Sequence, residues 1–187
     1  TNGDFVTVSS NTLIQPTTSM TLEAWVKPTE DPSTYDMNGI ISYLTLDGPA
    51  VEAGFAFIYT SGQLRFIVMT GDNDVMPNID SWPGIDIPFN GNTWTHIAGT
   101  YDGTIVKIFK NGEEEGSFNA PNNGGSIVWN DINHDFYIAK YQENYFNGSI
   151  DEVRLWEIVR TETQIQDAMN DSITDDPVGL LGYWNFN

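Results

Sequence analysis

Short runs of apolar residues alternate with polar residues along most of the chain, and Gly, Asn, Asp or Pro separates one run from the next. In residues 20–26, Leu22, Ala24 and Val26 occupy every second position, and Pro28 ends the run. A period of two residues is typical of a β-strand that buries one face. The pattern therefore predicts a chain built of short strands.

The pattern is clearest over Thr93–Phe118, where three apolar stretches are joined by two tight dipeptides. These dipeptides are Asp102-Gly103 and Asn111-Gly112. Asp-Gly and Asn-Gly supply the positive φ angles that two-residue hairpin turns need. We expect an antiparallel meander of three strands here.

The remaining pattern predicts an all-β fold with one short helix. Thr161-Glu162-Thr163-Gln164 fits a capping box, which indicates a helix over 162–170 near the C-terminus. Many strands without strand–helix alternation favour a two-sheet antiparallel β-sandwich, or jelly roll. Further strands are expected at 4–9, 40–46, 54–59, 63–69, 136–140, 148–156 and 180–186, and long polar connections at 29–38, 70–92, 119–135 and 141–147.

Composition narrows the classes of partner. The 187 residues suit one sandwich domain, and 6 Trp, 8 Tyr and 10 Phe provide a core. The net charge of −19 comes from 26 acidic and 7 basic residues, which disfavours nucleic acid and anionic lipid as partners. Cysteine is absent, so disulfides and thiolate metal sites are excluded. No apolar run approaches the length of a membrane span, so we expect no membrane insertion.

Five motifs in order carry a family resemblance over the whole chain. They are Asn2–Val6, Thr21–Pro28, Trp94–Gly112, Phe146–Trp156 and Leu181–Phe186. Together they resemble laminin-G-like (concanavalin A-like) jelly rolls. The resemblance implies a single domain over residues 1–187, taken from a larger secreted or cell-surface protein. Such folds serve as sugar binders, adhesion modules and spacers alike, so the resemblance does not name a ligand.

Asp151-Glu152 invites comparison with the paired carboxylates of glycoside hydrolases. Neighbours on a regular strand point to opposite faces, so we expect that these two carboxylates do not flank one sugar. Related glucanases resemble Glu-x-Asp-x-x-Glu on this strand, and here Ser149 stands where the first Glu would be. We therefore predict that the chain is not an enzyme. His96, mid-strand in the meander, is expected to pack or to form a hydrogen bond.

The resemblance also implies that the start of the chain lies beside the strand of Asp151. A structural Ca²⁺ there would take oxygens from Asp151, Asp4 and main-chain carbonyls near Asn2 and Gly3. The alternative is that both aspartates only accept turn or main-chain hydrogen bonds.

Aromatic residues in polar, turn-rich segments are the candidate ligand-binding residues, because sugar rings stack on aromatic planes. An equal alternative is that they plug the ends of the sandwich. By contrast, four Trp residues within the family motifs are expected to pack between the sheets, namely Trp25, Trp94, Trp156 and Trp184. The candidate ligand-binding residues are Tyr35, Trp82, Trp129, Tyr141 and Tyr145, with Lys140 beside them.

These observations favour a non-catalytic carbohydrate-binding module that tethers a secreted or surface protein to a polysaccharide. We expect a monomeric module linked to other domains. The alternative, from another class, is a protein-binding adhesion or spacer domain without a sugar site. Because basic residues are so few, we expect an anionic glycan as ligand only if some of these residues converge at one site, or if a Ca²⁺ ion bridges the protein and the glycan.

Overall fold

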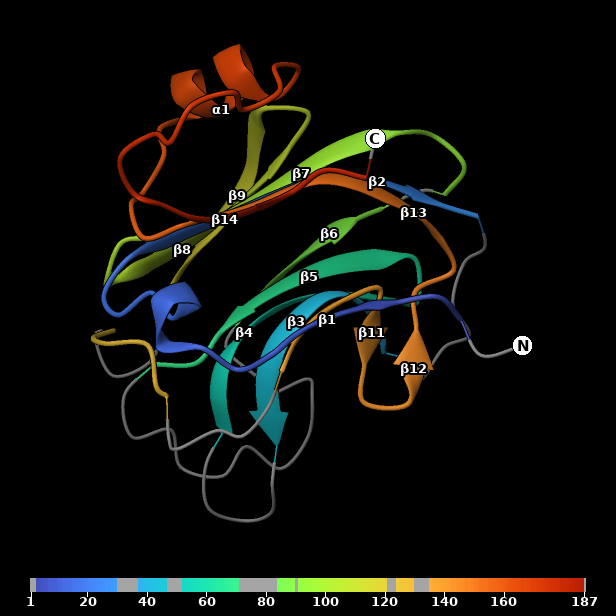
Figure 1. Ribbon diagram of the computed structural model, residues 1–187, viewed down its shortest axis with the longest axis horizontal. Helices are drawn as coiled ribbons and strands as arrows, with labels where there is room; N and C mark the ends of the chain where they lie inside the picture. Colours follow the sequence, from blue (N-terminus) through green and yellow to red (C-terminus); the bar gives the residue numbers. More distant parts are fainter. Residues whose placement is uncertain are drawn as a thin grey trace.

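The computed structural model describes residues 3–29, 37–46, 52–70, 84–89, 91–120, 124–129 and 135–186. They form two antiparallel sheets that face each other, as Figure 1 shows, with the one α-helix of these residues on the outer side of the upper sheet. The all-β sandwich predicted from the sequence is confirmed.

The lower sheet in Figure 1 has the strand order β1-β10-β3-β4-β5-β6, with the β11–β12 hairpin attached beside β3. Pairing is antiparallel except where Tyr145 of β12 meets Gly39 of β3. Its strands are β1 (Val6–Val8), β3 (Asn38–Leu46), β4 (Glu52–Thr60), β5 (Gln63–Val68), β6 (Gly84–Pro88), β10 (Phe136–Ile138), β11 (Lys140–Tyr141) and β12 (Asn144–Tyr145).

The upper sheet has the order β14-β13-β2-β7-β8-β9. A 3-10 helix, η1 (Thr12–Ile14), connects β1 to this sheet. The strands are β2 (Met20–Pro28), β7 (Thr95–Tyr101), β8 (Ile105–Lys110), β9 (Glu113–Asn119), β13 (Gly148–Trp156) and β14 (Leu180–Trp184).

The core lies between the sheets and is built from the alternate, inward-facing residues of both. Leu22, Ala24 and Val26 are fully buried there, as their spacing predicts. At Gly99 of β7 the sheets approach closely, because an added Cβ would lie 2.5 Å from Cδ1 of Phe66. A side chain at this position would push the sheets apart.

The predicted meander is confirmed as β7, β8 and β9. Asn111 and Gly112 have φ angles of 51° and 83°, and Gly103 has 97°. These left-handed values are the reason for the two dipeptides.

The predicted helix is α1 (Glu162–Ala168), two residues shorter than expected. Both hydrogen bonds of the capping box are present, because Gln164 N donates to Thr161 Oγ1 and Thr161 N donates to the Gln164 side chain. Ile165 is the fully buried residue of the helix and packs on the outer face of the upper sheet, against Ala98 and Phe109.

The structure differs from the predicted connections at two places. β6 lies within the predicted connection 70–92, and β12 lies within 141–147. The edge strands β6 and β9 lie close to each other, with Ile85 against Gly116.

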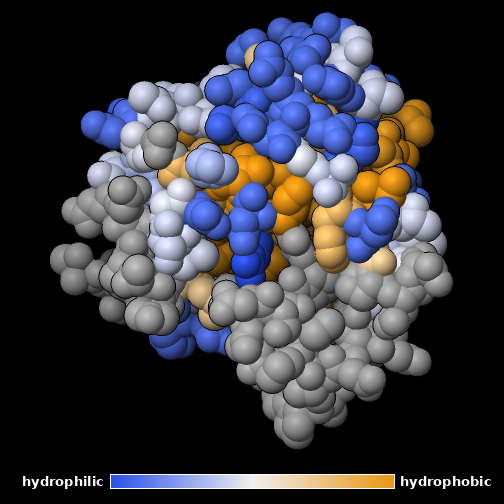
Figure 2. Space-filling model, turned by 180° about the vertical axis from the view of Figure 1, so that it is seen from behind, coloured by the Kyte–Doolittle hydropathy of each residue, from blue (hydrophilic) through white to orange (hydrophobic). Residues whose placement is uncertain are grey.

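Figure 2, seen from behind Figure 1, shows an apolar region at the surface between more polar areas.

The four motif tryptophans were predicted to pack between the sheets. One does so, two pack on the outer face of the upper sheet instead, and one is exposed. Trp184 stacks on Phe136 in the core, with ring centroids 4.8 Å apart. Trp25 and Trp156 pack on the outer face of the upper sheet, where Trp25 donates to the carbonyl of Met169 after α1 and Trp156 donates to Glu23 of β2. Trp94 is 46% exposed, so the prediction that it is a packing residue is wrong. It directly precedes β7, whose pairing with β2 begins at Thr95.

Candidate functional site

One side of the lower sheet is irregular. It is formed by the edge strand β1, its neighbour β10 and the β11–β12 hairpin. The sequence predicts one strand over 136–140, but Ala139 has a φ of 68° and breaks it into β10 and β11. Phe146 N donates to the carbonyl of Ala139, which fixes the break. Lys140 then pairs with Tyr145 across the hairpin.

This edge brings together three aromatic rings and one lysine, which we call the aromatic–lysine surface (Phe5, Tyr137, Lys140 and Tyr145). The Phe5 ring lies 5.7 Å from that of Tyr145 and 6.3 Å from that of Tyr137, centroid to centroid. Lys140 Nζ lies 4.6, 5.3 and 5.6 Å from the centroids of Phe5, Tyr137 and Tyr145. Phe5 is 41% exposed and the other three side chains are half-buried.

A pocket of about 230 Å³ adjoins this surface, and we call it the edge pocket. It lies where β1 and β10 of the lower sheet meet the start of β13 and the C-terminal segment. Phe5 belongs to both the pocket and the aromatic–lysine surface. The lining residues are Asp4, Phe5, Val6, Ile138, Ala139, Gly148, Ile150 and Phe186.

The edge pocket and the aromatic–lysine surface combine the groups that recognise a sugar. The exposed ring of Phe5 offers a flat apolar face to C–H groups, and Asp4 offers carboxylate oxygens to hydroxyl groups. Lys140 adds a cation beside the same ring. Together they make a shallow, mixed apolar and polar site.

Of the predicted ligand-binding residues, the structure brings Lys140 and Tyr145 into this site. Tyr141 lies next to them in sequence, but it is 1% exposed and packs against Ile58 and Ile67 on the outer face of the lower sheet. It therefore offers no ring face to a ligand. Tyr35 and Trp82 lie outside the described residues.

Trp129 packs as the alternative interpretation of the loop aromatics expects. Its ring centroid lies 4.9 Å from that of Tyr43 and 5.8 Å from that of Phe55. Its Nε1 donates to the carbonyl of Pro16 at 2.8 Å. The indole thus closes one end of the core.

Two residues that sequence reasoning missed, Phe5 and Tyr137, complete the site. Both occur within predicted strands, where alternation assigns one face to the core. Their place in the sheet is the feature that could have identified them as site residues. Phe5 directly precedes β1, the edge strand of the lower sheet, and Tyr137 lies on β10, the strand next to it, so both lie near one edge of the sheet.

Among the predicted metal ligands, Gly3 and Asp4 lie at this same edge, and Asn2 lies outside the described residues. Gly3 packs on Tyr145, since an added Cβ would lie 2.9 Å from Tyr145 Cβ. Asp4 is exposed and lines the edge pocket with Gly148. The start of the chain therefore does lie beside β13, as the resemblance implies.

Asp151 Oδ1 accepts hydrogen bonds from Glu152 N at 2.8 Å and Phe186 N at 3.1 Å. Its second carboxylate oxygen accepts no hydrogen bond from a described residue. In the described part of the chain, no three His, Cys, Asp or Glu residues form a group that could hold a metal. A Ca²⁺ would need Asp4, Asp151 and several main-chain or water oxygens.

The prediction that Asp151 and Glu152 point to opposite faces is wrong, because a β-bulge interrupts β13 at this point. Ile150 and Val153 both pack against the core, so the two carboxylate residues between them lie outside it. Glu152 takes a φ of 52° to form the bulge.

Both carboxylates of the bulge are nevertheless engaged. Glu152 accepts from Arg154 Nη2 at 2.7 Å and from the Tyr183 hydroxyl at 2.7 and 2.8 Å. Burial, and then the hydrogen bond to Glu152, raises the pKa of Tyr183 above its usual value. Asp151 holds the chain end through Phe186 N.

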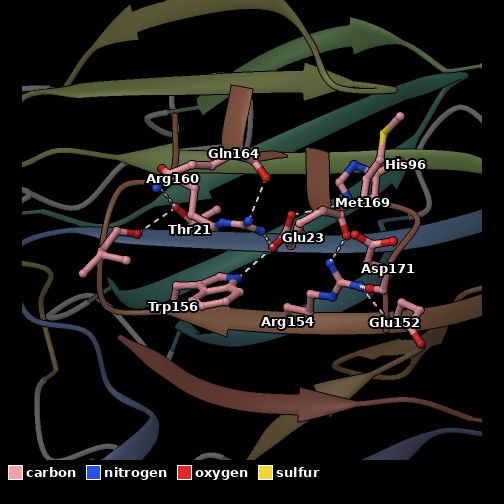
Figure 3. Close-up of polar contacts among 12 residues, drawn as sticks. Thr21, Glu23, His96, Glu152, Arg154, Trp156, Arg160, Gln164, Met169 and Asp171 are labelled. Carbon is pink, nitrogen blue, oxygen red and sulfur yellow. Dashed lines mark hydrogen bonds and ion pairs between the residues drawn. The ribbon is translucent and has the colours of Figure 1, made fainter. Parts of the chain in front are cut away.

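Beneath α1, a buried charged network joins β2, β7 and β13 to the helix (Figure 3). Glu23 is fully buried, and its Oε1 accepts from Arg160 Nη1 at 2.6 Å and from Trp156 Nε1 at 2.7 Å. Arg160 also donates to the carbonyl of Gln164, and Arg154 donates to that of Ala168. The network fixes the helix and the segment after it on the sheet.

His96 completes this network without carrying charge. Its Nε2 lies 3.6 Å from Glu23 Oε2, which would favour a protonated imidazole. Burial outweighs this contact and, together with the nearby Arg154 and Arg160 charges, lowers the pKa of His96 from 6.5 to about 3. The Glu23 charge is already compensated by Arg160, so the imidazole stays neutral near neutral pH.

A family model for the concanavalin A-like lectin/glucanases superfamily, in its laminin G group, matches residues 1–166. The chain belongs to this superfamily. A comparison with the sequences of curated proteins gives no match. The fold of this chain is that of a lectin-like, carbohydrate-binding type of domain.

Solved structures confirm the fold. A Bacteroides ovatus protein described as carbohydrate-binding is 22% identical, with a TM-score of 0.65, over 97% of this chain and 48% of that one. The binding domain of botulinum neurotoxin DC, in complex with SialylT, is 14% identical, with a TM-score of 0.62, over 89% of this chain and 39% of that one. The chain thus spans half or less of the length of these proteins.

Among the residues that the structure describes, no helix has both the length and the apolar character needed to cross a membrane.

Proposed function

We propose that this superfamily member is a non-catalytic carbohydrate-binding module, and that it binds a glycan at the edge pocket and the aromatic–lysine surface. In this role it tethers a secreted or surface protein to a polysaccharide. The observation that carries the proposal is Phe5. Its ring is 41% exposed, lines a pocket and lies among two tyrosines and a lysine. An exposed ring that is grouped with other aromatic residues beside a pocket is typical of a ligand-binding surface.

Two comparisons support a glycan as that ligand. A structurally similar protein is described as carbohydrate-binding, and another similar domain is described in complex with SialylT. The non-catalytic role is supported by the bulge on β13, because Asp151 and Glu152 there hold main-chain and side-chain partners. A retaining or inverting glycoside hydrolase needs one carboxyl group to protonate the leaving oxygen and a second to attack the sugar or to activate a water molecule.

Affinity electrophoresis against a panel of polysaccharides tests the proposal, with Phe5→Ala as the site variant. A sugar face stacked on the ring covers on the order of 50 Å², or about 1.3 kcal/mol. Losing it should weaken binding about eight-fold. The melting temperature should change less than after loss of a core aromatic residue, because the ring is 41% exposed in the unbound protein.

Trp94→Ala is the matched control, since Trp94 is 46% exposed but belongs to neither surface. It should leave retention unchanged. Retention that depends on Trp94 and not on Phe5 would place the site elsewhere. If no polysaccharide retards the protein, the result would favour the alternative function, an adhesion or spacer domain without a sugar site.

A structural Ca²⁺ is proposed as well, at the junction of the chain start and β13. The support is that Asp4 lines the edge pocket with Gly148 and Ile150, while Asp151 keeps one carboxylate oxygen without a hydrogen bond from a described residue. When bound, the ion would fix these two segments together.

A further inference from the structure

Lys140 differs from the other basic residues in its surroundings. The chain has seven basic side chains, and five of them form an ion pair within 4 Å. Lys27 and Lys140 form none with a described residue. The five pairs are Arg65–Asp86, Lys107–Glu114, Lys110–Glu115, Arg154–Glu152 and Arg160–Glu23.

Lys140 is held by rings instead of by a carboxylate. Its Nζ lies within 5.6 Å of three ring centroids and donates no hydrogen bond to a described residue. Its ammonium group therefore has N–H donors that the described residues leave unmet. The rings attract the cation through their faces and limit its motion.

We propose that Lys140 makes this site selective for an acidic sugar, a pyranose that carries a carboxylate. The inference rests on the proposed glycan binding and names the class of ligand for that same site. A sugar stacked on Phe5 would place its carboxylate against the ammonium of Lys140. Asp4, which lines the pocket beside Phe5, would accept hydrogen bonds from the hydroxyl groups.

The net charge of −19 does not oppose this assignment at close range. Charges farther apart than about 8 Å are largely screened at physiological ionic strength. The local balance therefore decides, and among the described residues no carboxylate lies within 4 Å of Lys140 Nζ.

Two pairs of probes test the assignment and distinguish the sources of the carboxylate. The first pair is polygalacturonate and its carboxyl-reduced form, which has the same linkage without the charge. The second is sialyllactose and lactose. Titration calorimetry should show that the protein binds the charged member of at least one pair more tightly.

Lys140→Gln should weaken binding of that charged member about five-fold, the upper end of what an exposed ion pair contributes. It should leave the neutral member unchanged, and Lys140→Arg should retain the preference. Lys107→Gln removes the same charge from β8 and is the control, which should change neither member. Raising the salt concentration should reduce the preference in the wild type.

The assignment is overturned if both members of each pair bind equally, if neither charged probe binds, or if Lys140→Gln affects both members alike. Phe5→Ala keeps this result separate from the proposed function. If Phe5→Ala weakens binding and Lys140→Gln does not, the glycan site stands and its charge selectivity falls. If Phe5→Ala leaves binding unchanged, the proposed site itself falls.

Discussion

His96 should make the protein less stable as the pH falls below neutral. The folded protein keeps this imidazole neutral, because burial lowers its pKa to about 3, whereas the unfolded chain binds a proton with a pKa of 6.5. Between these two values the unfolded state holds more protons than the folded state. The stabilisation is therefore complete above 6.5 and is lost as the pH falls towards 3.

The size of the effect follows from these two pKa values. Between about pH 7 and about pH 5, protonation of the unfolded chain at this one residue lowers the free energy of unfolding by about 2 kcal/mol. Among the described residues whose pKa is shifted, His96 is the one with an ordinary value inside this window. The groups that face it are Glu23, Arg154, Arg160 and the Trp25 ring.

Urea unfolding at the two pH values, followed by tryptophan fluorescence, measures the effect in the wild type and in His96→Gln. The wild type should lose about 2 kcal/mol more than the variant, and the variant also subtracts the contribution of His134. Equal losses would refute the reasoning. An NMR titration of the wild type provides a second check, in which the His96 imidazole should remain neutral at about pH 5.

Three further predictions concern stability. Glu23→Ala leaves the buried Arg160 charge and the Trp156 N–H without their shared acceptor, and should lower the free energy of unfolding by about 3–5 kcal/mol. A loss below about 1 kcal/mol in chemical unfolding would show that the network is not coupled to folding. Trp129→Ala removes an indole packed on Tyr43 and should cost about 3–5 kcal/mol in the same assay, and a stable variant with weaker glycan binding would restore its predicted role in the ligand site. If Ca²⁺ joins the chain start to β13, excess chelator should lower the melting temperature of the wild type but not of Asp151→Ala, and a melting temperature that ignores chelator would count against the ion.

Local patterns in the sequence were enough to predict the fold. The two-residue period of β2 and the dipeptides of the meander act over a few residues, so they can be read without knowing what lies across the sandwich. The capping box before α1 is equally local. β6 was missed because it lies in a stretch rich in Gly, Pro and Asp, where its pairing to β5 decides its conformation.

The site was predictable only in part, because it depends on contacts between distant segments. Lys140 and Tyr145 were found from their polar, aromatic surroundings, but Phe5 joins them from the other end of the chain. Glu23 has the sequence position of a solvent-facing residue on β2, and it is buried because α1 and Arg160 cover that face. The bulge at Glu152 likewise depends on Arg154 and Tyr183, which no strand period reveals.

Chemical-shift mapping by NMR is the most direct test of the glycan site, and a chain of 20.9 kDa is suitable for it. Titration with a polysaccharide fragment that the protein retains should shift the amide signals of Phe5, Lys140, Tyr145 and Phe186, and should leave those of Trp94 and α1 unchanged. Shifts clustered at Trp94, or around α1, would contradict the assignment of glycan binding to the edge pocket and the aromatic–lysine surface.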